Sequence, residues 1–298
     1  MVSRRELYDE CTTLLSSAGK ESPEFDTLCI FQDMLGDKTP MFQPLRDVPD
    51  EQAERIRKLT AERAKGYPLQ YLLGKWEFYG LDFYVGEGVL IPRPDTETLV
   101  DQVLDICREN GLTSPVIIDL CSGSGCIAIT LQKHLPSAEV HAVEISDKAL
   151  GYLRKNKELN SSGIHIYEGD VLKSSTAEAL PQADIIVSNP PYLTAQDMRE
   201  LEKEVTCEPA LALFGGSDGL GFYRAITAVW RKHIRKGGFI AFEFGMGQHG
   251  DVENILLNGG FDDVVFRKDG AGIIRTAAAQ KTASMTQRHI DRSAVKTG

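Results

Sequence analysis

Apolar positions at helical spacing dominate the first 65 residues and predict three amphipathic helices. These helices are expected at residues 3–16, 22–35 and 49–65. Ser22 followed by Pro23 is typical of a helix start, and Asp50 is a candidate N-cap for the third helix. No strand pattern occurs before about residue 70, so a small helical unit is expected here.

The pattern changes at residues 76–85, where aromatic and apolar side chains surround Gly80 in the sequence WEFYGLDFYV. This arrangement predicts a β-hairpin with Gly80 in its turn. Pro92 and Pro94 then stiffen the chain. A helix is expected to follow in residues 95–110, with Asp95 or Thr96 as its cap.

Short apolar runs alternate with helical patterns from residue 115 onward. Strands are predicted at 115–120, 139–145, 164–169, 183–188, 237–245, 262–268 and 272–278, and helices at 126–135 and 147–159. Such alternation predicts an α/β fold with a parallel, doubly wound sheet and helices on both faces.

The first strand of this sheet leads into a glycine turn, DLCSGSGC, at residues 119–126. Ligands of such sheets bind beyond the carboxyl ends of the strands, and Gly125 would permit tight packing of the following helix. Glu144 ends the second strand, where its carboxylate can accept both hydroxyls of a ribose. Because Ala128 fits a relaxed dinucleotide fingerprint, the turn alone does not exclude NAD. Asp119 disfavours a pyrophosphate but suits the cationic groups of S-adenosylmethionine.

Two further strand ends complete the predicted site. Asp170 follows the third strand, where it can accept from an adenine amino group while Val171 packs on the ring. The fourth strand ends in SNPPYL, residues 188–193. Two prolines remove two N–H donors and hold the loop extended, which leaves rigid acceptors.

Rigid acceptors suit the methylation of a planar amino nitrogen, whose lone pair is delocalised and must be turned toward the methyl group. The side-chain oxygen of Asn189 and the carbonyl of Pro190 can grip both N–H bonds, and Tyr192 can stack on the planar group. An amino-methyltransferase is therefore predicted. An NAD-dependent dehydrogenase would leave the SNPPY sequence without a role.

Composition limits the class of protein without naming its substrate. The chain has 298 residues, 42% hydrophobic and 26% charged, and a formal net charge of −10. The charge argues against strong nonspecific binding to a polyanion. No apolar run is long enough for a membrane span, and the charged start does not resemble a signal peptide, so a cytoplasmic protein is expected. The six cysteines form no CxxC pair, so reduced thiols and no metal site are expected.

Several stretches resemble one family over nearly the whole length. DLCSGSGCIAI is similar to the S-adenosylmethionine motif of class I methyltransferases, and SNPPY to the NPPY motif of those that methylate planar nitrogen. GYPLQYLLGKWEFYGLDFYV, LIPRPDTETLVD, EPALALFGGSDGLGFYR and DGAGIIR resemble the HemK/PrmC family of protein-(glutamine) methyltransferases. The resemblance implies a Rossmann-like methyltransferase domain joined by a β-hairpin to a small N-terminal helical domain.

The resemblance also implies a substrate and a set of site residues. The substrate would be the glutamine of a Gly-Gly-Gln loop in class I peptide chain release factors, methylated on its side-chain amide nitrogen. S-adenosyl-L-methionine would be bound by Asp119, Cys121, Ser122, Gly123, Ser124, Gly125, Glu144, Asp170, Val171 and Asn189. The glutamine amide would be bound by Asn189, Pro190, Pro191 and Tyr192, with Asn189, Pro190 and Tyr192 as the catalytic residues.

Two positions depart from the family pattern. Cys121 stands where many relatives have glycine, which predicts an ordinary negative φ there. Glu144 stands where many have aspartate, which requires a slightly longer reach. The role of Arg93, in the PRPDTE stretch, stays open between bridging the hairpin and shaping the cofactor pocket.

The domain organisation expected from these features has four parts. They are a helical substrate-docking domain (1–74), a β-hairpin linker (75–92), a methyltransferase domain (93–280) and a polar tail (281–298). Two rival functions remain: methylation of adenine or cytosine in nucleic acid, and a binding module without turnover. The N-terminal helical segment holds more acidic than basic residues, which disfavours a nucleic-acid substrate.

Overall fold

The computed structural model describes residues 1–36 and 47–282, and its chain divides into two compact units. The helical unit comprises Met1–Trp76, Val85–Glu87 and Leu201–Cys207. The sheet unit comprises Glu77–Tyr84, Gly88–Glu200 and the chain from Glu208 onward. The segment at 201–207, expected in the methyltransferase domain, thus groups with the helical unit. Most of the predicted tail, residues 283–298, lies outside the described residues.

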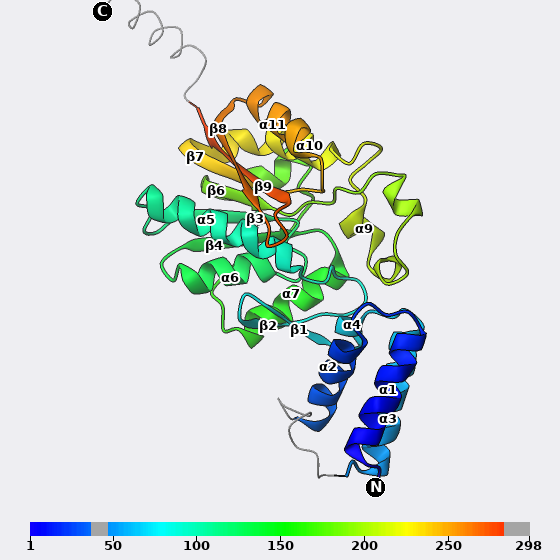
Figure 1. Ribbon diagram of the computed structural model, residues 1–298. Helices are drawn as coiled ribbons and strands as arrows, with labels where there is room; N and C mark the ends of the chain where they lie inside the picture. The colour runs from blue at the N-terminus through cyan, green and yellow to red at the C-terminus, as the bar shows by residue number, and fades with distance from the viewer. Residues whose placement is uncertain (37–46, 283–298) are drawn as a thin grey trace, which may run out of the picture. The chain divides into compact units, whose positions relative to one another are not determined.

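The helical unit contains the three predicted helices and a short fourth one (Figure 1). They are α1 (Arg4–Ser17), α2 (Pro23–Leu35), α3 (Asp50–Ala64) and α4 (Leu69–Leu73). Ser22 is the N-cap residue of α2, with Pro23 in its first turn, as predicted. Asp50 is not the cap of α3: Pro49 holds that place, and Asp50 is the first helical residue. There its carboxylate faces the positive end of the helix dipole.

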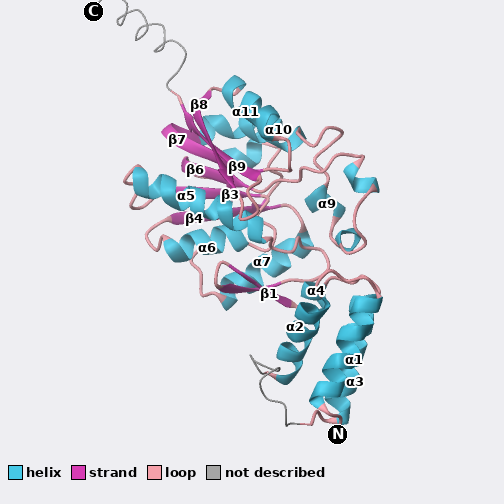
Figure 2. Cartoon of the chain, in the orientation of Figure 1, coloured by secondary structure: helices cyan, strands magenta, loops and turns pink. Residues whose placement is uncertain are grey.

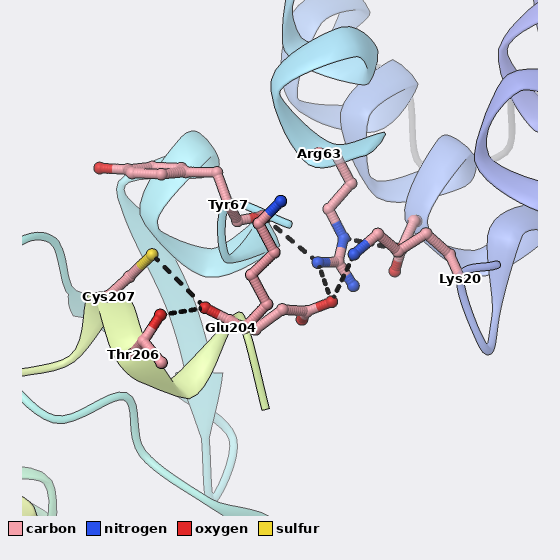
Figure 3. A network of polar contacts seen from close by, with 8 residues as sticks. Lys20, Arg63, Tyr67, Glu204, Thr206 and Cys207 are labelled. Atoms are coloured by element: carbon pink, nitrogen blue, oxygen red, sulfur yellow. Dashed lines mark hydrogen bonds and ion pairs between the residues drawn. The ribbon is translucent and has the colours of Figure 1, made fainter. Parts of the chain in front are cut away.

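Apolar side chains on facing sides of these helices form one small core, which includes the fully buried Leu7, Ile30, Phe31 and Ile56. A partly buried ion network lies beside it (Figure 3). Arg63 donates from Nε to Asp26 Oδ2 at 2.6 Å. Its Nη1 lies 2.6 Å from Glu204 Oε1. Lys20 Nζ lies 2.8 Å from the same Glu204 oxygen.

The Glu204 carboxylate therefore ties segment 201–207 to two helices of this unit. Burial alone would raise the pKa of Glu204, but the hydrogen bonds from Arg63 and Lys20 outweigh it and lower the pKa. Because each charge in the network has an opposite charge within hydrogen-bond distance, the network can be buried at tolerable cost.

The predicted hairpin is confirmed as the two-stranded sheet of β1 (Lys75–Phe78) and β2 (Leu81–Tyr84). Tyr79 and Gly80 in its turn have φ of 53° and 74°. Two successive positive φ values match the right-handed twist of a hairpin, which explains the glycine.

Seven strands form the large sheet, in the order β5-β4-β3-β6-β7-β9-β8. Their bounds are β3 Val116–Leu120, β4 Glu139–Glu144, β5 His165–Glu168, β6 Ala183–Ser188, β7 Ile234–Glu243, β8 Phe261–Lys268 and β9 Ile274–Lys281. All predicted strands are present. The prediction of a purely parallel sheet is wrong at one edge, because β9 pairs antiparallel with both β7 and β8. The short connection between β8 and β9 forms a hairpin, which parallel neighbours cannot have.

Helices cover both faces of this sheet, as predicted for a doubly wound fold (Figure 1). One core cluster contains residues of α5, α6 and α7, and the other contains residues of α8, α10 and α11. The helix bounds are α5 Glu97–Glu109, α6 Cys126–His134, α7 Asp147–Leu159, α8 Ser174–Glu178, α10 Gly221–Trp230 and α11 His249–Asn258. The fold is the Rossmann-like one expected from the sequence.

The connection from β6 to α10 is mostly loop, with only short helical turns (Figure 2). These are η3 (Asp197–Arg199), η4 (Val205–Cys207) and α9 (Ala210–Leu213); η2 (Pro94–Thr96) precedes α5, and η5 (Arg231–His233) follows α10. Within the described ranges no helix is both long and apolar enough to cross a membrane. All six cysteines are free thiols.

Candidate functional site

A cavity of about 270 Å³ opens at the carboxyl ends of β3, β4 and β5. Its lining includes all but four of the predicted cofactor-binding and substrate-binding residues. The predicted residues that line it are Cys121, Ser122, Gly123, Ser124, Glu144, Asp170, Val171, Asn189 and Pro191. Gly125, Pro190 and Tyr192 adjoin these residues in sequence but are not part of the lining, and neither is Asp119.

The turn after β3 differs from its predicted geometry at Cys121. A negative φ was expected for a non-glycine residue, but φ is +61°. The reason lies in the hydrogen bonds of the next residue: Ser122 donates its backbone N–H to Val143 O on β4 at 3.0 Å and its hydroxyl to Asp119 O at 2.9 Å. The chain must therefore turn sharply at Cys121, and the left-handed conformation costs an L-residue about 1–2 kcal/mol.

Two glycines of this turn have different roles. Gly125, with φ +83°, is the N-cap residue of α6, and a Cβ there would lie 2.2 Å from Leu153 Cδ1 of α7. Its small size therefore permits the tight packing that the sequence predicted. Gly123, with φ +55°, has no atom within 4 Å of its Cβ position, and its N–H donates to Glu144 Oε2 at 2.8 Å.

Glu144 is a buried carboxylate that organises the turn. Besides Gly123 N–H, it accepts the N–H groups of Ile145 and Ser146, both at 2.8 Å. These three bonds use three of the roughly four acceptor positions of a carboxylate. Binding both hydroxyls of a ribose, as predicted, would require at least one Glu144 oxygen to accept from the sugar and the backbone together.

Asp170 and Val171 follow β5 in the chain and line the cavity. Asp170 Oδ1 accepts the N–H of Leu172 at 2.9 Å, which fixes the carboxylate in place. The carbonyl of Val171 accepts from Trp230 Nε1 at 2.8 Å, and its side chain is buried. Leu172 and the half-exposed Ile145 also line the cavity, although the sequence gave no periodic signal for them.

Asp119 lies fully buried under the turn, and both of its carboxylate oxygens lack a hydrogen-bond partner in the described part of the chain. Burial raises its pKa to about 8, although Ser122 and the backbone of Ala128 oppose the shift. A buried carboxyl without a cation is expensive to ionise. These orphaned oxygens fit a cationic group arriving above the turn, such as the ammonium of S-adenosylmethionine.

The SNPPY loop leaves β6 with its acceptors unused. Asn189 donates from Nδ2 to Thr96 Oγ1 at 3.3 Å. Its Oδ1 and the carbonyl of Pro190 accept no hydrogen bond within residues 1–36 and 47–282. Tyr192 is half-buried, and burial raises the pKa of its hydroxyl to about 12, so the ring stays neutral.

A glycine-rich wall supports the back of this loop. A Cβ on Gly215 would lie 2.6 Å from Pro191 O, and one on Gly219 would lie 2.3 Å from Tyr192 O. Gln248 accepts from Gly245 N–H at 2.9 Å and donates to Tyr192 O at 3.1 Å. Backbone thus contacts backbone, which fixes the height of the loop and explains the glycines of the GGSDGLG stretch.

Arg93 lines the cavity, which favours the second of its two predicted roles. Its guanidinium pairs with the Glu208 carboxylate, whose other oxygen accepts Ile91 N–H at 3.0 Å. Burial raises the pKa of Glu208, although Arg93 and the Ile91 N–H oppose the shift. Glu208 begins the EPALALF stretch, so this ion pair joins that stretch to the cavity wall.

Three polar residues at the site escaped the sequence prediction because they lie far away along the chain. Asn156 of α7 is fully buried and donates to Ser124 O at 2.9 Å, and it also bonds both backbone groups of Tyr84. Thr96 contacts Asn189, and Glu243 ends β7 beside it. A polar residue at a strand end, Glu243 in FEFG, was the one available signal. No cluster of three or more metal-ligating side chains occurs among the described residues.

Comparisons with known proteins match both the helical segment and the sheet segment of the chain. A family model described as "PrmC N-terminal domain" matches residues 6–74, and one described as "Methyltransferase small domain" matches residues 96–214. The release factor glutamine methyltransferase of Thermodesulfovibrio yellowstonii is 39% identical, over 84% of this chain and 89% of that protein. That of Geobacter sulfurreducens is 37% identical, over 93% of this chain and 96% of that protein.

A solved structure shows the same fold at low identity. A methyltransferase from Pyrococcus furiosus is 17% identical with a TM-score of 0.52, covering 79% of this chain and 100% of that one. The two curated relatives match this chain along 89% and 96% of their own lengths. The chain therefore belongs to the family of release factor glutamine methyltransferases, enzymes that use S-adenosyl-L-methionine.

Proposed function

We propose that the protein transfers a methyl group from S-adenosyl-L-methionine to the side-chain amide nitrogen of a glutamine in a peptide chain release factor. The glutamine is the one in the Gly-Gly-Gln loop of class I factors, and the reaction takes place in the cytoplasm. The observation that carries the proposal is the pair of unused acceptors, Asn189 Oδ1 and Pro190 O, at the edge of the cavity.

The residues around the cavity suit the methyl donor. Glu144, with its remaining acceptor capacity, would take the ribose, and Asp170 and Val171 would take the adenine. The turn from Cys121 to Gly125 would lie against the amino-acid part, above the unpartnered Asp119 carboxyl. When bound, S-adenosyl-L-methionine supplies an electrophilic methyl carbon.

The chain's own task is to prepare the nucleophile. A primary amide has two N–H bonds and a lone pair delocalised into its carbonyl. Asn189 Oδ1 and Pro190 O would each accept one N–H, which holds the nitrogen and turns its lone pair toward the cavity. The nitrogen loses one proton only after the methyl group is bound, when it is cationic and acidic. No strong base is needed before that.

Tyr192 and the proline rings would hold the plane of the amide. The neutral ring of Tyr192 offers an apolar face, and its position is fixed through its carbonyl by Gln248. Pro191 is buried and lines the cavity, where its ring would pack against the amide. Glycines beside the glutamine would give the substrate segment the small size and flexibility to place that amide against the loop.

We also propose that the helical unit docks the release factor. The match to the PrmC N-terminal domain supports this role, and Leu14 and Phe25 are exposed apolar side chains on it. Leu14→Ser and Phe25→Ser are then expected to raise KM for the intact factor and to leave KM for a short Gly-Gly-Gln peptide unchanged. Equal effects on both substrates would contradict docking by these side chains.

A methyl-transfer assay with labelled donor tests the function. The acceptors are a purified release factor, the same factor with its loop glutamine changed to asparagine, and duplex DNA. Label is expected on the first acceptor alone, and the Asn189→Ala variant is expected to lower the rate of labelling roughly 10²–10³-fold. Asn258→Ala, at an exposed asparagine on α11, is the matched control and should label normally.

Each other outcome has a distinct meaning. Label on DNA alone would overturn the release-factor assignment and favour an amino-methyltransferase of nucleic acid. Labelling that persists in the glutamine-to-asparagine factor would mean that a different residue is methylated. Donor binding without any transfer would indicate a binding module.

A further inference from the structure

The end of β7 carries a buried carboxyl group beside the first residue of the SNPPY loop that leaves the sheet. β6 and β7 are parallel, with Ser188 opposite Phe242, so Asn189 and Glu243 come next on the two neighbouring strands. Side chains alternate along a strand, and Ala241 belongs to the core cluster that α5 covers. The Glu243 side chain therefore points to the α5 side of the sheet.

Thr96 lies on that side, directly before α5, and contacts both residues. Its Oγ1 accepts the Nδ2–H of Asn189 at 3.3 Å, so its own hydroxyl proton is left to donate elsewhere. The side chains of Thr96 and Asn189 both lie where they stabilise the charged form of the Glu243 carboxyl. These contacts connect the Asn189 amide nitrogen, the Thr96 hydroxyl and the Glu243 carboxylate.

Glu243 has no cationic partner at hydrogen-bond distance among the described residues. It is 3% exposed, and its Oε2 accepts no hydrogen bond there. Thr276, opposite it on β9, is also buried, with an unpartnered Oγ1. A buried acidic group that is not paired costs stability, so a structural ion pair does not explain it.

The chemistry of an ionised carboxylate does explain it, because such a group only accepts hydrogen bonds. A side-chain amide has two orientations, related by a 180° flip, that fill the same space. With its nitrogen toward Thr96, Asn189 presents Oδ1 to the cavity. After a flip, its oxygen would face the Thr96–Glu243 side, where the carboxylate repels it, and a donor would face the substrate N–H.

We propose that Glu243 is a positioning residue which, through Thr96, holds the side-chain amide of Asn189 with its oxygen toward the substrate. This inference rests on the proposed function of Asn189 as the acceptor for the substrate amide. Glu243 itself is not among the residues that line the cavity. Its effect is on which atom of Asn189 the substrate meets.

The ionisation of Glu243 should therefore control the orientation. Burial raises its pKa to about 7, with Thr96 and Asn189 opposing the shift. The titratable and charged groups that face it are Asp95 before α5, Arg275 on β9, Tyr192, Tyr223 on α10 and Cys126 on α6. Burial raises the pKa of Tyr192 and of Cys126 to about 12 and also raises that of Tyr223, so these three stay neutral near pH 7.

Glu243→Gln tests the proposal, because glutamine has the same shape but donates as well as accepts. We expect kcat to fall roughly 10–100-fold, while KM and the calorimetric Kd for the methyl donor change less than about twofold. The wild-type kcat should rise with pH through about 7 by a step that the variant lacks. Asp119 is retained in both proteins, so its own titration cancels in the comparison. Glu253→Gln on α11 is the matched control.

A spectroscopic reading separates this proposal from the proposed function. The side-chain ¹⁵N–¹H₂ signals of Asn189, identified by their loss in Asn189→Ala, should shift with a midpoint near pH 7 in the wild type. They should not do so in Glu243→Gln, and Thr96→Val should weaken the shift. This measurement needs no release factor, so it holds even if the acceptor is another molecule.

Three results would overturn the inference. One is a Glu243→Gln variant with wild-type kcat and pH profile. Another is an unchanged titration of the Asn189 signals in that variant. A variant that loses donor affinity and thermal stability together with activity would also show that Glu243 has only a structural role.

Discussion

Two sets of buried or partly buried carboxyl groups, one in each unit, differ in whether they have a charged partner. In the helical unit, Asp26 pairs with Arg63 at 2.6 Å, and Glu204 is held by both Arg63 and Lys20 (Figure 3). In the sheet unit, Asp119 and Glu243 are buried with carboxylate oxygens that have no partner in the described part of the chain.

The paired carboxylates stabilise the fold. The unpaired carboxyls are instead placed to interact with a ligand or to orient a neighbouring side chain. Pairing lowers the pKa of Glu204 despite its partial burial and opposes the rise that burial causes at Asp26, whereas burial raises the pKa of Asp119 to about 8 and of Glu243 to about 7. Unpaired buried carboxyls cost stability and cluster at functional sites. Changes in the first set should therefore alter stability, and changes in the second should alter chemistry.

The largest expected effect is on the paired set. Arg63→Ala leaves Asp26 buried without its partner, which should destabilise the helical unit by about 3–5 kcal/mol. Urea unfolding monitored by hydrogen exchange of the α1–α3 amides measures this loss. Arg57→Ala, which breaks an exposed pair with Glu10, is the control and should leave the midpoint unchanged. Equal losses in the two variants would remove the distinction between buried and exposed pairs.

The next effect concerns the unpaired side of the comparison. Asn189→Ala removes one of the two acceptors for the substrate amide and should lower kcat roughly 10²–10³-fold, a barrier increase of about 2.7–4 kcal/mol. Its thermal midpoint should stay near that of the wild type, because Asn189 makes one hydrogen bond of 3.3 Å. Steady-state kinetics and calorimetry on the same sample measure both. A large loss of stability would place Asn189 with the structural set.

Much of this site could be predicted from sequence because its residues lie at strand ends. The end of each parallel strand meets the same edge of the sheet, so Glu144, Asp170 and Asn189 were brought together by topology alone. The helices, the hairpin and the strands followed from periodicity in the same way. The antiparallel β9 did not, because a short apolar run carries no signal for its direction.

What the sequence could not predict depends on contacts between distant residues. Thr96 and Asn189 are 93 positions apart, and Arg93 and Glu208 are 115 apart. The positive φ of Cys121 was also missed, because steric rules for an isolated residue favour a negative value. The hydrogen bond from Ser122 to β4 overrides that preference.

A smaller effect should appear in the pH dependence of stability. Asp119 and Glu243 have folded pKa values of about 8 and 7, well above those of an unfolded chain. Between about pH 4 and those values the folded state binds more protons than the unfolded one, so the free energy of unfolding falls as pH rises. Each group contributes at most about 1.4 kcal/mol per pH unit.

Other groups complicate the absolute curve, so the test is a comparison of variants. Burial lowers the pKa of His141, despite Glu139, and this favours stability at higher pH. We expect Asp119→Asn and Glu243→Gln each to flatten the fall between pH 5 and 8, measured by urea unfolding without ligand. Glu204→Gln, which alters the paired set, should leave this window unchanged, because its lowered pKa acts at more acidic pH. If only Glu204→Gln flattened the fall in the free energy of unfolding between pH 5 and 8, the division into paired and unpaired carboxyls would be wrong.

The smallest effect is expected at Cys121, where the sheet unit stores strain in the backbone instead of in an unpaired charge. Cys121→Gly removes the strain of a φ of +61°, which should raise the free energy of unfolding by about 1–2 kcal/mol. The greater freedom of glycine in the unfolded chain should lower it by about 0.4–1 kcal/mol. A net stabilisation of about 1 kcal/mol or less should follow, with kcat nearly unchanged. Cys121→Ala keeps the strained φ but removes the thiol, so it should be less stable than the glycine variant. If the alanine variant is as stable as the glycine variant, the backbone at Cys121 carries no strain. The loss of stability at this site would then come only from its buried, unpaired carboxyls.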